Sequence, residues 1–458
     1  MVDVYEVASR TMDRLMSMRH PLLFLIVVGI LLRLVITPLS VVYDSEFWAL
    51  VVRNIEAGWG LYGVDGYYYT PVWGYFLGLS AAFQDLFMNI GEVAVKVVEL
   101  IPIEGLGLYF TSTIPSISFL FAVKVPLFAL DLAASLMIWY LIKDVTNSDR
   151  KAIAGFGLMF FSSVVFLSSG VIAMPDIVSA LFILLTVILL RKSHPFIAGM
   201  TFSVSVLSKF FPIFLLFVLV AYILANNRSD IRRGLVQVAS SALGTMVMTM
   251  ILLAPQIMEG DLAECFQFLS DRTGLATASS MFDTVTGALR MLTYVLVLLG
   301  AVYAGYFVYK NKENDLFETL MKGCLLVMAL SLLYPPTTQY IVSLIPFLAF
   351  WIVVKNRNFF PAWILLSCGA LVYVFASNAV VLMPMGVWWN IFDVGHLLEI
   401  FQLSSSGMGV ITWRNVQFVI GGVLQCVGII SVLLIMRYGG LSNLLECIRP
   451  AKRNDGTS

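Results

Sequence analysis

Two carboxylates, Asp44 and Glu46, stand where the first long apolar segment of the chain ends, within Val42-Tyr-Asp-Ser-Glu-Phe-Trp48. Ionisable groups beside the hydrocarbon of a bilayer are costly to hold there, so they usually mark a working site. A carboxylate in this position can take the proton of an attacking hydroxyl group. We therefore predict Asp44 as a general base, with Glu46 as the second candidate. Two carboxylates alone do not specify an ion, which leaves a requirement for Mg²⁺ or Mn²⁺ at this pair open.

Four basic residues are candidates for holding a negatively charged leaving group. Lys124 and Lys209 stand at the expected outer ends of apolar segments, and Arg33 and Arg272 are further candidates. Cations placed at the membrane surface would stabilise the charge that gathers on a departing phosphate. Two structural alternatives stay open: Lys124 and Asp131, seven residues apart on one helix face, form an internal ion pair, or the lysines extend to the interface.

Aromatic side chains accompany these charges. Tyr62, Tyr67 and Tyr69 can stack on sugar faces, although tyrosine is also common at membrane interfaces. Asp131 and Asp176 are acidic groups within expected spans, and we assign them to sugar or acceptor binding. Arg33 precedes Asp44 by eleven residues, so the two would face the same way if one helix ran through both.

Composition places these residues in a membrane protein. The chain has 458 residues, of which 60% are hydrophobic and 12% charged, and its mean hydropathy is +0.91. No soluble domain needs that much apolar surface. The formal net charge of +0 argues against a nucleic-acid partner, which would require a basic face. The five cysteines show no metal-binding spacing and are interpreted as packing residues.

Apolar segments of bilayer length predict an all-α polytopic protein with about 12 transmembrane helices. The segment 195–209 is the least secure of them, because it is short and runs into the next one. The expected spans are 21–42, 119–142, 153–172, 175–190, 195–209, 211–225, 234–255, 287–309, 317–334, 339–354, 359–382 and 415–436.

Lysine and arginine predict the orientation, because they are enriched in cytoplasmic segments. They gather in every second connection, which places both termini, residues 1–20 and 437–458, in the cytoplasm of a single domain in the cell membrane. The long connections 43–118, 256–286 and 383–414 are then external. Within the first of these, amphipathic helices are expected over 45–57, 71–83 and 85–101.

No ATP or nucleotide sugar is present outside a cell, so a transfer reaction there requires a lipid-borne donor. The candidate residues belong to short motifs that cover roughly residues 33–350. In chain order, these motifs are Asp44-Ser-Glu46, Gly58-Trp-Gly-Leu-Tyr62, Tyr67-Tyr-Tyr-Thr-Pro71, Lys124-Val-Pro126 with Asp131, Met174-Pro-Asp176, Lys209-Phe-Phe-Pro212 and Pro335-Pro-Thr-Thr-Gln-Tyr340.

In this order the motifs resemble those of the GT-C superfamily of integral membrane glycosyltransferases, which use polyprenyl-phosphate sugars. The order is most similar to that of the catalytic subunit of the GPI mannosyltransferase that adds the first mannose, and of its prokaryotic relatives. The resemblance implies an inverting hexosyltransferase, with Asp44 as catalytic base and basic residues at the donor phosphate. It also implies sugar or acceptor contacts for Gln339 and Tyr340. The acidic motif departs from Asp-x-Asp, and residues after about 350, including His396, match nothing in the family.

We therefore expect an enzyme that moves a sugar, mannose first, from a polyprenyl-phosphate donor to a lipid, glycan or protein acceptor on the external face. The alternative from another class is a secondary transporter or lipid flippase, which twelve spans with internal charges would also suit. Transporters often contain two related halves with paired broken helices. The long acidic and aromatic connection occurs only once here, which favours the enzyme.

Overall fold

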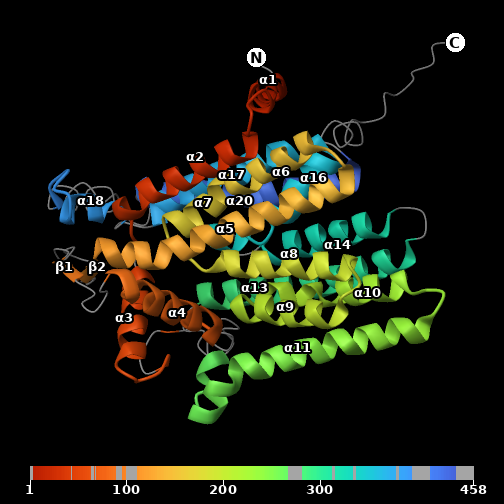
Figure 1. The fold of residues 1–458 in the computed structure, drawn as a ribbon, viewed down its shortest axis with the longest axis horizontal. Coiled ribbons are helices and arrows are strands. Elements are labelled where there is room, and N and C mark those ends of the chain that lie inside the picture. Colours follow the sequence, from red (N-terminus) through yellow and green to blue (C-terminus); the bar gives the residue numbers. More distant parts are fainter. Residues whose placement is uncertain are drawn as a thin grey trace.

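The chain folds into a bundle of helices that run roughly along the long axis of the molecule (Figure 1). The computed structural model describes residues 4–42, 44–62, 67, 69–88, 95–99, 111–266, 281–311, 315–333, 337–377, 381–394 and 413–439. Over these residues the expected all-α architecture is confirmed, apart from one short hairpin.

The N-terminal part supplies an apolar helix and the elements that follow it at one end of the bundle. The first helix, α1, precedes the apolar α2, which opens with a proline at its first position, where the missing N–H costs nothing. These elements are α1 (Val4–Met16), α2 (Pro21–Ile36), η1 (Thr37–Leu39), α3 (Asp44–Glu56), α4 (Pro71–Met88) and the antiparallel pair β1 (Val95–Glu99) and β2 (Thr111–Pro115).

The middle part begins with the longest central helix, α5, whose start is capped by Ser116 accepting a hydrogen bond from the N–H of Phe119 at 3.2 Å. The next two helices, α6 and α7, are bent by 47° at the break between them. The elements are α5 (Ile117–Thr146), α6 (Asp149–Phe160), α7 (Ser163–Gly170), α8 (Asp176–Arg191), α9 (Pro195–Ser208), η2 (Phe211–Leu215), α10 (Leu216–Asn226) and α11 (Ile231–Glu259).

The C-terminal part completes the bundle and packs α17 against α20. Its elements are α13 (Met281–Lys310), α14 (Leu316–Ser331), α15 (Thr338–Ile341), α16 (Ile345–Val354), η3 (Arg357–Phe359), α17 (Phe360–Ser377), α18 (Met383–Val387) and α20 (Trp413–Tyr438).

Six helices among the described residues are long and apolar enough to cross a membrane, or seven if the bent pair α6 and α7 forms one span. A multi-pass membrane protein is thereby supported, whereas the expected number of about twelve spans is not confirmed. Several expected spans form helices that are too short: α9 has 14 residues and α16 has 10. At 1.5 Å per residue they measure about 21 and 15 Å, less than the roughly 30 Å of a hydrocarbon core.

The connection 43–118 has the predicted helices in its first two parts, because α3 and α4 match the expected helices 45–57 and 71–83. The third part differs, since β1 occupies residues within the expected helix 85–101. Valine-rich Val95–Glu99 has the β-branched side chains that fit a pleated strand better than a helix.

The two ends of the bundle differ in chemistry. Figure 1 shows α3, α4 and the two strands together at one end, which we call the α3 end. Helix termini rich in lysine and arginine lie at the opposite end, which we call the basic end, and ion pairs join them: Arg191 with Asp144 at 2.8 Å and Lys355 with Glu318 at 2.7 Å. This separation agrees with the charge pattern used to predict orientation, while the sidedness of the membrane stays a prediction.

Candidate functional site

Asp44 is the first residue of α3, at the α3 end of the bundle (Figure 1). A short turn precedes it, in which the N–H of Ser45 donates to the carbonyl of Val42 at 3.0 Å. The carboxylate is half-buried, and the helix behind it is anchored by Trp48, which is 1% exposed. A carboxylate at a helix N-terminus is favoured by the helix dipole. Asp44 is thus held by rigid structure while remaining accessible.

Lys209 and Asp176 form an ion pair at the same end. Asp176 opens α8 and is fully buried, and Lys209 directly follows the last residue of α9. The distance from Lys209 Nζ to Asp176 Oδ1 is 3.4 Å, and the Lys209 side chain is 6% exposed. The sequence placed both residues at the outer ends of successive spans, and the structure brings them together.

Two tyrosine rings enclose this lysine. The ammonium of Lys209 lies 4.7 Å from the ring centre of Tyr69 and 4.9 Å from that of Tyr340. Both distances are within the range of cation–π attraction. Phe211 packs against Tyr340 with ring centres 5.0 Å apart, and the Tyr69 hydroxyl lies 4.0 Å from Met174 Sδ. We call Asp44, Asp176, Lys209, Tyr69 and Tyr340 the lysine site.

Hydrogen bonds within the segment before α4 position Tyr69. The Tyr62 hydroxyl donates to the carbonyl of Tyr69 at 2.8 Å, and the Tyr67 hydroxyl donates to the carbonyl of Thr70 at 3.0 Å. The Thr70 hydroxyl in turn donates to the carbonyl of Leu207, near the end of α9. Tyr62 and Tyr67 therefore fix the segment that carries Tyr69, and Thr70 ties it to the helix that carries Lys209.

Electrostatics link Asp44 to the rest of the lysine site. Burial raises the pKa of Asp44 above its usual 3.8, and the ammonium of Lys209 opposes that rise. Burial also raises the pKa of the Tyr69 hydroxyl, and Lys209 lowers it while Asp44, Tyr340 and Asp176 raise it further. Desolvation disfavours the charged form of an acid, and a nearby cation restores it. Lys209 thus lowers the pKa of Asp44 and partly offsets the larger effect of burial, which raises it.

Arg33 and Asp131 form a second ion pair, which is fully buried. Arg33 Nε donates to Asp131 Oδ2 at 2.9 Å, and its Nη2 donates to the carbonyl of Phe160 at 2.8 Å. The hydroxyl of Ser169 donates to the same Asp131 oxygen. We call the ion pair of Arg33 and Asp131 the arginine pair. The single helix that would have carried both Arg33 and Asp44 does not form, because α2 ends at Ile36 and α3 begins at Asp44.

Lys124 has a third environment. Its ammonium donates to the carbonyls of Thr37 and Ser40 at 3.2 and 2.6 Å and to the Ser40 hydroxyl at 3.0 Å. These three bonds satisfy all three protons of the ammonium and hold the segment around η1. Lys124 and Asp131 therefore do not pair with each other, and this geometry favours a structural role for Lys124 over a phosphate contact.

The remaining predicted residues are placed in part. Gln339 is half-buried on α15 beside Tyr340. Glu46 lies in α3, but its side chain is outside the described structure, as are Arg272 and His396. Across the residues described, no three His, Cys, Asp or Glu side chains group together as metal ligands. The cation that pairs with Asp176 and influences Asp44 is the lysine ammonium, so we derive no step through a metal ion.

Two structural contributors to the site were not predicted. The hydrogen bond from Thr70 to Leu207 joins residues 137 positions apart. A contact between residues so distant in the chain cannot be predicted from the local sequence around one threonine. Trp48 packs edge-on against Tyr69 with ring centres 5.3 Å apart and against Trp73 at 5.6 Å. The position of Trp48 on the apolar side of the predicted helix 45–57 is consistent with burial, but it does not indicate that Trp48 contacts Tyr69.

Comparison with known proteins does not extend these observations. No known protein-family model matches the chain, and a search of curated proteins finds no significant relative.

Proposed function

We propose that this chain is an integral membrane glycosyltransferase that moves one sugar, mannose as the first candidate, from a polyprenyl phosphate to an acceptor hydroxyl at the α3 end. The observation that carries the proposal is the convergence of the lysine site. Residues from five separate parts of the chain place a half-buried carboxylate, a caged lysine and two tyrosines together at one end of a membrane bundle. Ionisable groups gathered in this way are a signature of function.

Asp44 is the general base in this mechanism. As the acceptor oxygen attacks the anomeric carbon, its proton passes to the Asp44 carboxylate, and the bond between that carbon and the phosphate oxygen breaks. The phosphate leaves with the bonding electrons, so a single displacement inverts the configuration of the sugar. Partial exposure of Asp44 leaves it open to an acceptor, and the nearby ammonium of Lys209 favours its ionised form.

Lys209 stabilises the charge that develops on the departing phosphate. Its ammonium is held in place by Asp176 and by the rings of Tyr69 and Tyr340, so no reorganisation is needed as the charge develops. Asp176 acts here as a positioning residue. Arg272 is a further candidate for binding the phosphate. Arg33 and Lys124 have structural roles, because their hydrogen bonds hold α2 and the segment around η1 against α5 and α6.

The proposal is tested with the purified full chain in detergent, supplied with polyprenyl-phosphate mannose or polyprenyl-phosphate glucose and a panel of lipid, glycan and peptide acceptors. Mass spectrometry of the products is expected to show one added hexose and free polyprenyl phosphate in equal amounts. A nucleotide sugar serves as the negative control. Hydrolysis alone, or no turnover across the panel, would contradict the proposal.

The rival transport function predicts a different result in the same preparation. Reconstituted in liposomes, a transporter would exchange labelled substrate across the bilayer without changing it covalently. We expect no such counterflow of polyprenyl-phosphate sugar, and counterflow without product would favour transport.

A further inference from the structure

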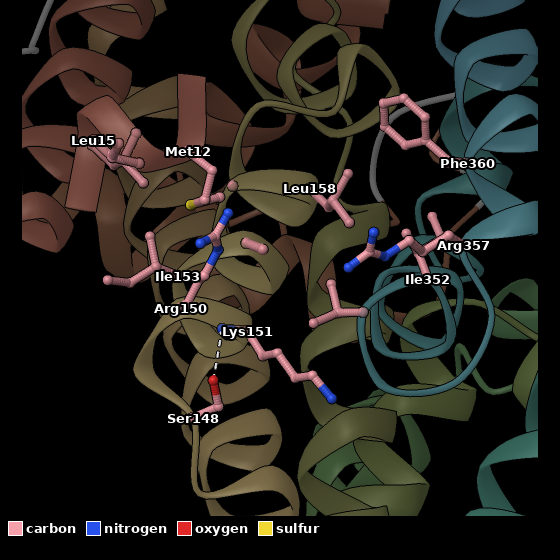
Figure 2. A pocket seen from close by; sticks show the side chains of 14 residues that line it. Met12, Leu15, Ser148, Arg150, Lys151, Ile153, Leu158, Ile352, Arg357 and Phe360 are labelled. Carbon is pink, nitrogen blue, oxygen red and sulfur yellow. Dashed lines mark hydrogen bonds between the residues drawn. The ribbon is translucent and has the colours of Figure 1, made fainter. Parts of the chain in front are cut away.

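A cavity lies at the basic end of the bundle, away from the lysine site (Figure 2). It has a volume of about 490 Å³ and lies between α1, α2, α6, α16 and the start of α17. That volume falls within the range of small-molecule sites. The cavity sits where apolar helices begin, because both α2 and α17 start beside it.

The lining of this cavity combines an apolar wall with cations. Leu25, Ile153, Leu158 and other hydrophobic side chains form most of it. Arg150 and Lys151 come from the start of α6, and Arg357 comes from η3 on the other side of the cavity (Figure 2). No aspartate or glutamate is among its 14 lining residues, all of which the structure describes.

Exposed acidic side chains lie near the start of α6, where two of these cations stand. Arg150 forms an ion pair with Asp13 of α1 at 2.8 Å, with both side chains more than half exposed. Asp149, the residue before Arg150, forms an ion pair with Lys143 at 2.8 Å. Exposed pairs of this kind contribute little and exchange readily with another anion. The cavity therefore presents positive charge at its edge and hydrocarbon within.

We propose that this cavity binds one anionic phospholipid, with its phosphate at Arg150, Lys151 and Arg357 and an acyl chain along the apolar wall. Basic pockets between membrane helices bind anionic lipid headgroups, and each added cation contributes to that preference. Because Met12 and Leu15 of α1 also line the cavity, the bound lipid joins the N-terminal helix to the bundle. This inference does not depend on the proposed enzymatic activity.

Gly157 offers a direct way to fill the cavity. It lines the cavity within α6, and a Cβ added there would meet no other atom within 4 Å. Gly157→Leu therefore places a side chain where the acyl chain would lie, without a clash at its first carbon. Glycine also weakens helix interiors, so this substitution is expected to preserve folding. Gly422→Leu in α20 is the matched control, because its added Cβ also meets nothing and it lies outside the cavity.

The test is native mass spectrometry of the purified full chain in detergent, titrated with dioleoyl phosphatidylglycerol or dioleoyl phosphatidylcholine. We expect one phosphatidylglycerol to be retained per chain, in clear preference to phosphatidylcholine. Lys151→Gln with Arg357→Gln should reduce phosphatidylglycerol retention by about twentyfold, at about fivefold per charge. Lys192→Gln with Lys310→Gln, basic residues outside the cavity, should leave it unchanged.

Gly157→Leu should reduce retention as well, while Gly422→Leu should not. Unfolding midpoints measured without lipid confirm that each variant is folded, and the charge and cavity variants test the proposal independently. Equal retention of the two lipids, or retention by folded Gly157→Leu at the level of the unmodified chain, would overturn the proposal. Displacement of the lipid by millimolar inorganic phosphate would likewise overturn it, since it would identify a simple anion site.

Discussion

The lysine site and the arginine pair each join a basic residue to an aspartate inside the same bundle, yet they are built in opposite ways. In the arginine pair, Asp131 and Arg33 are fully buried, and the guanidinium donates to both the carboxylate and backbone carbonyls. In the lysine site, Asp44 is half-buried and Lys209 is held by a longer ion pair and two rings. The comparison separates charges enclosed in the core from charges that we propose to act on a substrate.

Packing explains why the two differ. The guanidinium of Arg33 lies 4.1 Å from the ring centre of Phe160, and its hydrogen bonds connect α2 with α5 and α6. Lys209, which is 6% exposed, instead follows the last residue of α9 at the α3 end, where Thr70 joins the segment before α4 to that helix.

The largest effect is expected from Asp44→Asn, which keeps the shape of the side chain and removes its basicity. Loss of a general base should reduce turnover by about 10²- to 10⁴-fold, with an unchanged unfolding midpoint. The assay is sugar transfer under saturating donor. Glu46→Gln is the companion variant, and near-normal turnover of Asp44→Asn with loss in Glu46→Gln would move the base to Glu46.

Arg33→Leu should act on stability instead. It leaves Asp131 buried without its cation, which costs about 3–5 kcal/mol of unfolding free energy. Denaturant titration in detergent measures this loss. The double variant Arg33→Leu with Asp131→Leu should recover most of it, because both charges are then gone. A double variant as unstable as the single one would show that the pair is not the cause.

Lys209→Met should reduce turnover by about 2–4 kcal/mol of transition-state stabilisation, which is about 30- to 1000-fold. Lys124→Met is the contrasting variant, because in the described structure the ammonium of Lys124 forms hydrogen bonds only with Thr37 and Ser40, at the two ends of η1. It should reduce stability while leaving turnover per folded molecule nearly unchanged. Equal losses of turnover in the two variants would remove the distinction between them.

The pH dependence of transfer should follow the ionisation of Asp44. A base must be deprotonated, so the rate should fall as pH decreases through the Asp44 pKa, which burial raises above 3.8. Lys209→Met removes the cation that opposes this rise, so the acid limb of its residual activity should move to higher pH. A pH–rate profile for both proteins measures the difference, and an unmoved acid limb would show that Lys209 does not act on the base.

Tyr340→Leu should have the smallest effect. It removes one of the two rings that enclose Lys209, and a cation–π contact contributes about 0.5–2 kcal/mol, so turnover should fall by about 2- to 30-fold. Tyr306→Leu is the control, since Tyr306 makes a similar contact with Lys310 at the basic end. An equal decrease in both variants would indicate a general effect on packing.

The sequence was sufficient to predict the helical class and the position of the acidic motif. Apolar length indicated a membrane protein, and helical spacing indicated α3 and α4. The placement of Asp176 and Lys209 at neighbouring helix ends also followed from where their apolar segments ended. Such properties depend on neighbours in the chain, and so a single sequence contains them.

The partners of each charge could not be predicted in the same way. Arg33 was expected to face the same way as Asp44 if one helix ran through both residues. The helix ends at Ile36 and η1 follows it, and Arg33 forms a hydrogen bond with Asp131. The expected number of about twelve spans is not confirmed, because several apolar segments form helices shorter than the bilayer is thick. Pairing across the bundle depends on three-dimensional packing, which local spacing does not encode.

The most direct test of the account is a side-by-side measurement of Asp44→Asn and Asp131→Asn, recording sugar transfer per folded molecule and the unfolding midpoint of each. The account predicts opposite effects of the two variants on transfer and on stability. Asp44→Asn should lose transfer and keep its midpoint, while Asp131→Asn should lose midpoint and keep most of its transfer per folded molecule. If both aspartate variants lose transfer equally, or if Asp44→Asn transfers sugar at the normal rate, the distinction between the lysine site and the arginine pair is contradicted.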